Sequence, residues 1–161
     1  MLEESALDPE RHDRSGFSCG VPALDDYLKR FAVQHRRKGI STVYILADPA
    51  VPDQIVGYYT LSSAQLDAAQ LSAEDRAGLP RYPVPCIRMG RLACRSDRQG
   101  EGIGKLLVGR AVTRCMEART QVAAYGLLVD AKDDQAAAFY ERYGFKVCTG
   151  NRLTLYLPFG K

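Results

Sequence analysis

Apolar residues return every three to four positions once the chain leaves a polar, turn-rich stretch of 20 residues at its N-terminus. Leu24, Leu28 and Phe31 share one face of a helix drawn with this period. Pro22 stands in the first turn, where proline is a typical start signal, and Gly39 is a typical stop signal. The pattern predicts one amphipathic helix between Pro22 and Gly39.

Short apolar runs bounded by turn residues predict strands in the next part of the chain. Residues 42–47 and 55–62 flank a turn with two prolines, which predicts a hairpin. Residues 63–80 are rich in Ala, Gln and Asp and are expected to include a short helix. Three prolines then favour an extended backbone leading into a third strand over residues 86–94.

The second half of the chain alternates helices and strands. A long amphipathic helix is expected after residue 104, because Leu107, Ala111 and Cys115 form one ridge. Gly144 predicts a left-handed cap at the end of a later helix. The other expected elements are a strand over 125–129, a helix over 133–143 and strands over 145–148 and 153–158. The order predicts a single mixed α/β (α+β) domain spanning 1–161.

Composition excludes several classes of protein. With 46% hydrophobic and 25% charged residues the chain fits a soluble globular protein, and no apolar run is long enough for a membrane-spanning helix. No secretory signal is expected at the N-terminus. The five cysteines form no C-x-x-C pair and only two histidines are present, so neither a metal site nor a disulfide framework is expected. A reducing cytoplasm fits best, with each cysteine as a small core residue.

The net charge of +3 conceals an uneven distribution. Residues 29–38 carry a net charge of +5 and residues 76–119 a net charge of +7, which leaves −9 for the rest of the chain. The 16 arginines outnumber the 6 lysines, and the guanidinium group suits phosphate because it donates two parallel hydrogen bonds. The distribution indicates a basic surface that faces a polyanion, with a solvated helix face as the alternative.

A glycine-rich segment, residues 98–105 (RQGEGIGK), lies between a predicted strand and a predicted helix, an arrangement that binds phosphate through backbone N–H groups. It fails the dinucleotide fingerprint because Leu107 replaces the third glycine, and it fails the nucleoside-triphosphate P-loop because a leucine replaces the Ser/Thr. Gln99, Gly102 and Gly104 instead fill the pattern Q/R-x-x-G-x-G/A. A purely structural turn is the alternative.

This pattern resembles the acetyl-CoA pyrophosphate loop of the GNAT acetyltransferases, and the resemblance covers roughly residues 40–160. It implies the GNAT fold: a mixed central sheet flanked by helices, with splayed strands forming the CoA cleft and residues 91–94 on the splayed strand. It also implies acetyl-CoA as acetyl donor. The residues that it assigns to acetyl-CoA are Leu92, Ala93, Cys94, Gln99, Gly100, Glu101, Gly102, Ile103, Gly104, Lys105, Asp133, Ala136 and Phe139.

A narrower resemblance spans nearly the whole chain. Residues 12–20, 57–62, 88–93, 138–140 and 153–159 are similar, in order, to GNAT toxins of bacterial type II toxin–antitoxin pairs. Those toxins acetylate the α-amino group of aminoacyl-tRNA and thereby block translation. The resemblance implies a homodimer, a ribbon–helix–helix antitoxin that holds the toxin inactive in a repressor complex, and operator DNA bound only through the antitoxin.

Tyr140 matches the catalytic tyrosine of that family. A phenol is a suitable acid for the departing thiolate because its pKa of ~10 is close to that of a thiol. Packing of the helix on the sheet is the alternative role, and the one we favour for Phe139. No buried carboxylate stands near the cleft as a strong base, and Glu101 and Asp130 are weak candidates. This favours an α-amine, whose pKa of ~8 lies below that of lysine at ~10.4.

The basic segments supply candidate contacts to the tRNA backbone, for which Lys and Arg dominate affinity. The candidates are Lys29, Arg30, Arg36, Arg37, Lys38, Arg76, Arg81, Arg88 and Arg91. Arg91 could equally be a structural strand residue. Two other functions stay open: acetylation of a small-molecule amine or a protein lysine, and a non-catalytic RNA-binding module on a GNAT scaffold.

Overall fold

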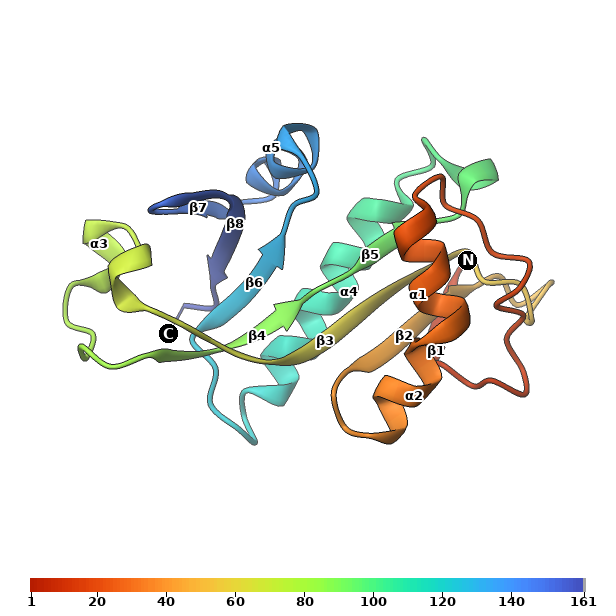
Figure 1. The fold of residues 1–161 in the computed structure, drawn as a ribbon, viewed down its shortest axis with the longest axis horizontal. Coiled ribbons are helices and arrows are strands. Elements are labelled where there is room, and N and C mark those ends of the chain that lie inside the picture. Colours follow the sequence, from red (N-terminus) through yellow and green to blue (C-terminus); the bar gives the residue numbers. More distant parts are fainter. Residues whose placement is uncertain (161) are drawn as a thin grey trace. The chain divides into compact units, whose positions relative to one another are not determined.

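The computed structural model describes residues 1–160 and is a mixed α/β structure (Figure 1). Its eight strands follow the order β1-β2-β3-β4-β6-β8-β7, and β5 pairs with β3. The chain divides into two compact units: Met1–Ser62 with Arg91–Ala111, and residues 63–90 with the chain from Val112 onward. Whether these form the single domain expected from chain length stays a prediction. Among the described residues no helix combines the length and apolar character needed to span a bilayer.

The first unit is built on antiparallel strands. Two short helices and the start of a long helix cover these strands. Strands β1 and β2 pair with each other, β2 pairs with β3, and β5 pairs with the start of β3. Its elements are β1 (Glu3–Ala6), α1 (Pro22–Arg30), α2 (Ala32–Arg37), β2 (Thr42–Ala47), β3 (Gly57–Leu66), β5 (Leu92–Cys94), the 3-10 helix η2 (Ser96–Arg98) and the first turns of α4 (Ile103–Ala118).

Helices α1 and α2 bury their apolar residues against one face of β2 and β3. Leu28 is fully buried there with Phe17, and the Tyr58 hydroxyl donates a hydrogen bond of 2.6 Å to the Leu24 carbonyl. The opposite face of β3 takes α4 at Gly57, where an added Cβ would lie 2.9 Å from the Ala93 carbonyl oxygen and 3.0 Å from Leu107. Only glycine allows β5 and α4 to approach β3 so closely.

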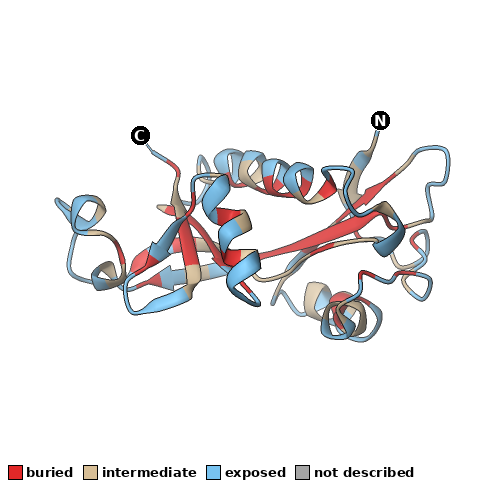
Figure 2. Ribbon diagram, turned by 90° about the horizontal axis from the view of Figure 1, so that it is seen from above, coloured by how far each residue is buried: buried red, intermediate tan, exposed pale blue. Residues whose placement is uncertain are grey.

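The second unit carries parallel and antiparallel pairs. Strand β4 pairs in parallel with β6, and β6 and β7 both pair antiparallel with β8. Its elements are the 3-10 helix η1 (Ala68–Gln70), α3 (Ala73–Arg76), β4 (Val84–Met89), β6 (Gly126–Asp130), α5 (Asp134–Arg142), β7 (Lys146–Cys148) and β8 (Asn151–Pro158). Many of the buried residues lie in the strands of both units, as the red segments of Figure 2 show.

Several predicted elements are confirmed, and others differ. The hairpin of β2 and β3 is present, and Gly144 ends α5 with a φ of +93°. The helix predicted up to Gly39 is instead two helices, because the backbone breaks at Phe31, whose side chain is 40% exposed and leaves the apolar face. Strand β1 was missed because the sequence EESA has no apolar alternation.

The strand predicted over residues 86–94 is also wrong as a single element. It is two strands, and they take different partners: β4 pairs with β6, whereas β5 pairs with β3. The interruption falls at Gly90 and Arg91, and the Arg91 backbone exchanges hydrogen bonds with Thr60 instead of continuing the β4 ladder.

The cysteines occupy the core, as the sequence predicts. Four of the five are buried and Cys94 is half-buried. Burial raises the pKa of every one of them, to about 11 for Cys19 and Cys148 and about 12 for Cys115. Because a thiolate is the nucleophilic form, none of these thiols is activated at neutral pH.

A polar cluster fastens α3 to β8 inside the second unit. The Asp75 carboxylate accepts hydrogen bonds from the Tyr156 hydroxyl at 2.7 Å and from Lys146 Nζ at 2.8 Å. The Tyr156 hydroxyl in turn accepts the Ser72 backbone N–H at 3.0 Å. Burial raises the pKa of Asp75, but these partners and Ser72 lower it further, so the net pKa lies below the ordinary value of 3.8.

We expect Asp75→Asn to lower the free energy of unfolding at pH 7 by about 1–3 kcal/mol, because it removes charge-assisted hydrogen bonds from a poorly exposed group. A depressed carboxyl pKa stabilises the fold above the unfolded pKa, and that stability is lost as the pH falls through the folded pKa. The wild-type melting temperature should therefore fall more steeply than that of the variant when melting curves are taken at pH 7 and pH 3.

The matched control is Asp134→Asn, whose ion pair with Arg152 has side chains that are 75% and 74% exposed. Exposed pairs contribute little, so this change should alter unfolding by less than about 0.5 kcal/mol. Equal melting temperatures for the Asp75 and Asp134 variants would contradict a stabilising role for the cluster.

Candidate active site

The glycine-rich loop connects η2 to α4 in the first unit. The Gln99 side-chain amide donates a 2.9 Å hydrogen bond to the Cys94 carbonyl, so this glutamine ties the loop back to the end of β5. Gly100 and Gly102 have φ angles of +84° and +76°, in the left-handed region that favours glycine. An added Cβ at either position would meet nothing within 4 Å, so the loop is open on that side.

The loop presents backbone donors at the start of α4. The first N–H groups of an α-helix have no partner within the helix, and the helix dipole places positive charge there. Here those groups belong to Ile103, Gly104 and Lys105, and the Lys105 side chain is exposed. Arg98 Nε donates to both Glu101 carboxylate oxygens at 2.9 Å, so these two loop charges neutralise each other. The geometry suits an anion bound by backbone groups.

The residues predicted to bind the cofactor through β5 differ in exposure. Ala93 is buried, and Leu92 and Cys94 are half-buried. Leu92, Ala93 and Cys94 pair with the start of β3, and the Cys94 thiol lies 3.7 Å from the Arg98 carbonyl oxygen. These three residues and the loop from Gln99 to Lys105 therefore belong to one unit and one local structure.

Tyr140 lies on α5 in the second unit and is 7% exposed. Its ring packs against Phe145 at 5.4 Å and against Phe139 at 5.3 Å between centroids. Burial, and then the charge of Asp130, raise the pKa of Tyr140 to about 12, so its hydroxyl keeps its proton at neutral pH. No group of residues 1–160 forms a hydrogen bond with this hydroxyl, which leaves it available to a substrate atom.

The other predicted cofactor residues of the second unit hold α5 in place. The Asp133 carboxylate caps α5 and accepts the Ala136 N–H at 2.8 Å. Phe139 is half-buried and packs edge-on against Tyr143, with centroids 5.1 Å apart. Asp133 thus has a structural role that the sequence did not indicate, and Ala136 lies in the first turn of the capped helix.

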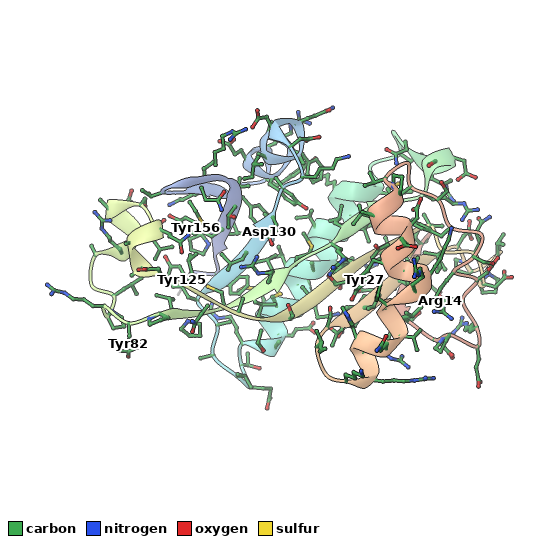
Figure 3. All side chains as sticks on the ribbon, viewed as in Figure 1. Arg14, Tyr27, Tyr82, Tyr125, Asp130 and Tyr156 are labelled. Atoms are coloured by element: carbon green, nitrogen blue, oxygen red, sulfur yellow. The ribbon has the colours of Figure 1, made fainter. Side chains whose placement is uncertain are left out.

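A row of polar side chains crosses three strands of the second unit. The sequence indicated Asp130 only as a weak candidate for the base and did not indicate the row. Arg88 on β4 forms an ion pair with Asp130 at the end of β6, and the Thr154 hydroxyl on β8 donates to the same carboxylate at 3.4 Å. Figure 3 labels Asp130 at the end of its strand. Period-2 alternation places Arg88 and Asp130 on one face of their strands, but their pairing depends on a strand register that no local pattern reveals.

The predicted tRNA contacts are divided between the two units. In the first unit four of them are exposed: Lys29 and Arg30 at the end of α1, Arg37 at the end of α2 and Lys38 directly after it. Arg30 forms an ion pair with Asp26. Arg36 differs from these four because its guanidinium donates to the Leu7 carbonyl. In the second unit Arg76 and Arg81 are exposed, whereas Arg88 is engaged by Asp130.

Arg91 has a structural contact that sequence reasoning missed. Its guanidinium lies over the ring of Tyr27 on α1, 3.6 Å from the centroid, and Figure 3 labels this tyrosine. The Tyr27 hydroxyl is 3.1 Å from His35 Nδ1, so the ring is held in place. Stacking of this kind immobilises the guanidinium while its in-plane donors can still bind an anion.

The described part of the chain contains no group of three or more His, Cys, Asp or Glu side chains placed to hold a metal ion.

Comparison with known proteins identifies this arrangement. Residues 40–147 match the acetyltransferase (GNAT) domain. A tRNA-acetylating toxin of Mycobacterium tuberculosis (strain ATCC 25618 / H37Rv) is 34% identical over 145 residues, which are 90% of this chain and 85% of the relative. The match spans both units.

Two solved structures are similar over almost the full length. The toxin AtaT complexed with acetyl-methionyl-tRNAfMet has a TM-score of 0.91 and 32% identity, over 98% of this chain and 95% of that chain. A tyrosine-to-phenylalanine mutant of AtaT, bound to the C-terminus of the antitoxin AtaR and to acetyl-CoA, has a TM-score of 0.83 and 30% identity, over 98% and 93% of the two chains. The fold and family predicted from the sequence are confirmed: the chain belongs to the GNAT family of acetyltransferases.

Proposed function

We propose that the chain is the toxin of a type II toxin–antitoxin pair and transfers the acetyl group of acetyl-CoA to the α-amino group of aminoacyl-tRNA, which blocks translation. The observation that carries the proposal is the similarity, over 98% of the chain, to a toxin solved with acetyl-methionyl-tRNA. Tyr140, buried, protonated and without a hydrogen-bond partner among the described residues, supplies the acid that this reaction requires.

The reaction needs one acid and a neutral amine. The lone pair of the amine nitrogen forms a bond to the thioester carbonyl carbon, the C–S bond breaks, and the sulfur takes the proton of the Tyr140 hydroxyl. The proton released by the nitrogen passes to solvent, and solvent reprotonates the phenolate. The products are N-acetyl-aminoacyl-tRNA and the free thiol of CoA. A raised pKa keeps Tyr140 protonated until the thiolate departs.

The predicted acetyl-CoA contacts of both units remain proposals. In the first unit the N–H groups of Gly102, Ile103, Gly104 and Lys105 would hold the pyrophosphate, with Gly100 and Gly102 allowing its close approach. The remaining proposed contacts are Leu92, Ala93, Cys94, Gln99 and Glu101 in the first unit and Asp133, Ala136 and Phe139 in the second. Gln99 and Asp133 would act by shaping the backbone, because their side chains are already bonded within the protein.

The proposed partners follow from the same similarity. A relative binds the C-terminus of its antitoxin, and we expect an antitoxin with a ribbon–helix–helix segment here, which would carry the operator DNA contact of the repressor complex. A homodimer and a cytoplasmic location stay predictions. The nine basic candidates are proposed as tRNA contacts, with Arg36 and Arg88 held by internal partners in the structure without tRNA.

The decisive experiment is mass spectrometry of bulk aminoacylated tRNA after incubation with the protein and acetyl-CoA. We expect a mass increase of one acetyl group on one or more aminoacyl ends. Acetylation of free amines or peptide lysines with charged tRNA unchanged would favour the small-amine or lysine enzyme. Salt-dependent tRNA binding without consumption of acetyl-CoA would favour a non-catalytic RNA-binding module.

Exposed basic residues at the C-terminal end of α2 should contribute to tRNA binding through counterion release. We expect Arg37→Ala and Lys38→Ala each to weaken tRNA binding and to reduce the slope of log K against log salt concentration by about 0.7–0.9. Fluorescence anisotropy with labelled tRNA between low and physiological salt measures this slope. Arg152→Ala, an equally exposed arginine outside the proposed set, should leave the slope unchanged; a slope that responds equally to all three changes would contradict a binding role for α2.

A further inference from the structure

The polar row of Arg88, Asp130 and Thr154 has a composition that its strands do not need for folding. Its ion pair is partly exposed to solvent: the Arg88 side chain is 36% exposed and that of Asp130 is 40% exposed. Exposed pairs contribute little to stability, so this one offers the fold small benefit. The row holds the Asp130 carboxylate in one orientation, because donors from the strands on both sides of β6 bind it.

Asp130 keeps capacity to bind a further donor. An ionised carboxylate has about four lone-pair sites, and Arg88 and Thr154 occupy two of them. The groups that face Asp130 come from every element around it: Arg88 from β4, Thr154 from β8, Tyr140 from α5 and Cys148 from β7. Arg88 is the one cation among them, and the thiol and the phenol are neutral at pH 7 because burial raises the pKa of both.

The position of Asp130 relative to Tyr140 suggests a role for this carboxylate in the reaction. Asp130 ends β6, and α5, which carries Tyr140, begins at Asp134. The Asp130 charge acts on the Tyr140 hydroxyl within the same unit. In the proposed reaction the hydroxyl serves the departing sulfur, so the nitrogen that attacks the same carbonyl carbon must arrive nearby. A protonated α-amine has three N–H donors and needs an acceptor there.

We propose that Asp130, oriented by Arg88 and Thr154, binds the α-ammonium group of the aminoacyl end of the tRNA. This contact would select a tRNA that carries an amino acid over a tRNA whose acyl group has no amine. The inference rests on the proposed function, because it names the group that recognises the acceptor. Asp130 holds the amine by hydrogen bonds, and solvent takes the proton that the ammonium group releases. The neutral amine then keeps one N–H···O bond to Asp130, which directs its lone pair away from the carboxylate.

The binding test changes the α-amine of the tRNA as well as residues of the protein. The same tRNA is acylated either with an amino acid or with the corresponding α-hydroxy acid, and binding of both is measured with Asp130→Asn, Arg88→Gln and wild-type protein. We expect wild-type protein to bind the tRNA that carries the amino acid at least 10-fold more tightly than the tRNA that carries the α-hydroxy acid. Asp130→Asn should bind both ends equally, whereas Arg88→Gln, which removes one of the two donors that orient Asp130 and also a proposed tRNA contact, should weaken binding of both ends and reduce the preference without abolishing it. Asp134→Asn is the control carboxylate and should behave as wild type.

Kinetics supply a second readout. A carboxylate beside an ammonium group raises the pKa of the bound amine, so Asp130→Asn should shift the acidic limb of the kcat–pH profile to lower pH. The KM for aminoacyl-tRNA should rise about 10-fold while acetyl-CoA binding is unchanged, and Asp130→Glu should recover part of the loss.

Equal binding of both ends by wild-type protein, or an undiminished preference in Asp130→Asn, would overturn the proposal. These outcomes differ from failure of the proposed function, in which wild-type protein acetylates no aminoacyl-tRNA at all.

Discussion

Tyr140→Phe is expected to reduce kcat for acetyl transfer by about 10²–10⁴-fold and to relieve growth arrest in cells that express the protein. A positioned general acid contributes an acceleration of this size, and the two aromatic rings that pack against Tyr140, those of Phe139 and Phe145, carry no exchangeable proton. The substitution removes only the hydroxyl, and the ring can keep its contacts with Phe139 and Phe145.

The measurement is single-turnover transfer of labelled acetyl to charged tRNA, beside growth curves of expressing cells. Acetyl-CoA binding should stay within about twofold of wild type, because the lost interaction is made with the departing sulfur. Tyr143→Phe is the matched control at the C-terminal end of the same helix, since its ring also packs against Phe139, and it should retain activity. Full activity of the Tyr140 variant would exclude Tyr140 as the acid.

Gly102→Val is expected to weaken acetyl-CoA binding by at least about 10-fold. Gly102 has a φ of +76°, where a side chain costs roughly 1–2 kcal/mol and a β-branched one is strongly disfavoured. Nothing in the protein lies within 4 Å of an added Cβ, so packing is not disturbed. The loop would instead change its backbone, and the N–H groups at the start of α4 would no longer converge on a phosphate.

Titration calorimetry with acetyl-CoA measures this loss, and Gly78→Val separates it from general strain. Gly78 has a φ of +81° and is equally open, but it lies in the loop after α3 in the second unit. Both variants should melt at similarly lowered temperatures, whereas only Gly102→Val should lose acetyl-CoA. Comparable loss of affinity in both variants would show that the loop has no special role.

The structure changes how three of the predicted contacts are understood. Gln99, which fills the first position of the loop pattern, holds the loop to β5 by its side chain instead of pointing to a ligand. Arg91 stacks on Tyr27, and Arg88 pairs with Asp130. The last two pairings join residues far apart in the chain, with 42 positions separating Arg88 from Asp130, whereas Gln99 and Cys94 are only five positions apart. No spacing rule reaches over such a distance.

Features that depend on a few consecutive residues could be predicted from the sequence alone. The positive φ at Gly102, the cap at Gly144 and the start of α4 after a glycine-rich loop are local, because backbone sterics and unpaired N–H groups act within a turn or two. The family-like motifs added Tyr140 as the candidate catalytic tyrosine. Uneven charge indicated a polyanionic partner but not which arginines face it, as the contact of Arg36 with the Leu7 carbonyl shows.

What only the tertiary structure decided is the partnership of segments distant in the chain. The apolar stretch of residues 86–94 reads as one strand, yet β4 and β5 pair with different neighbours, because hydrogen-bond register is a property of two strands and not of one. The same register brings Arg88, Asp130 and Thr154 into one row. The sequence thus predicted the fold class, a glycine-rich loop before α4 and Tyr140 as the candidate acid, whereas the carboxylate that we propose for the amine depended on strands meeting in space.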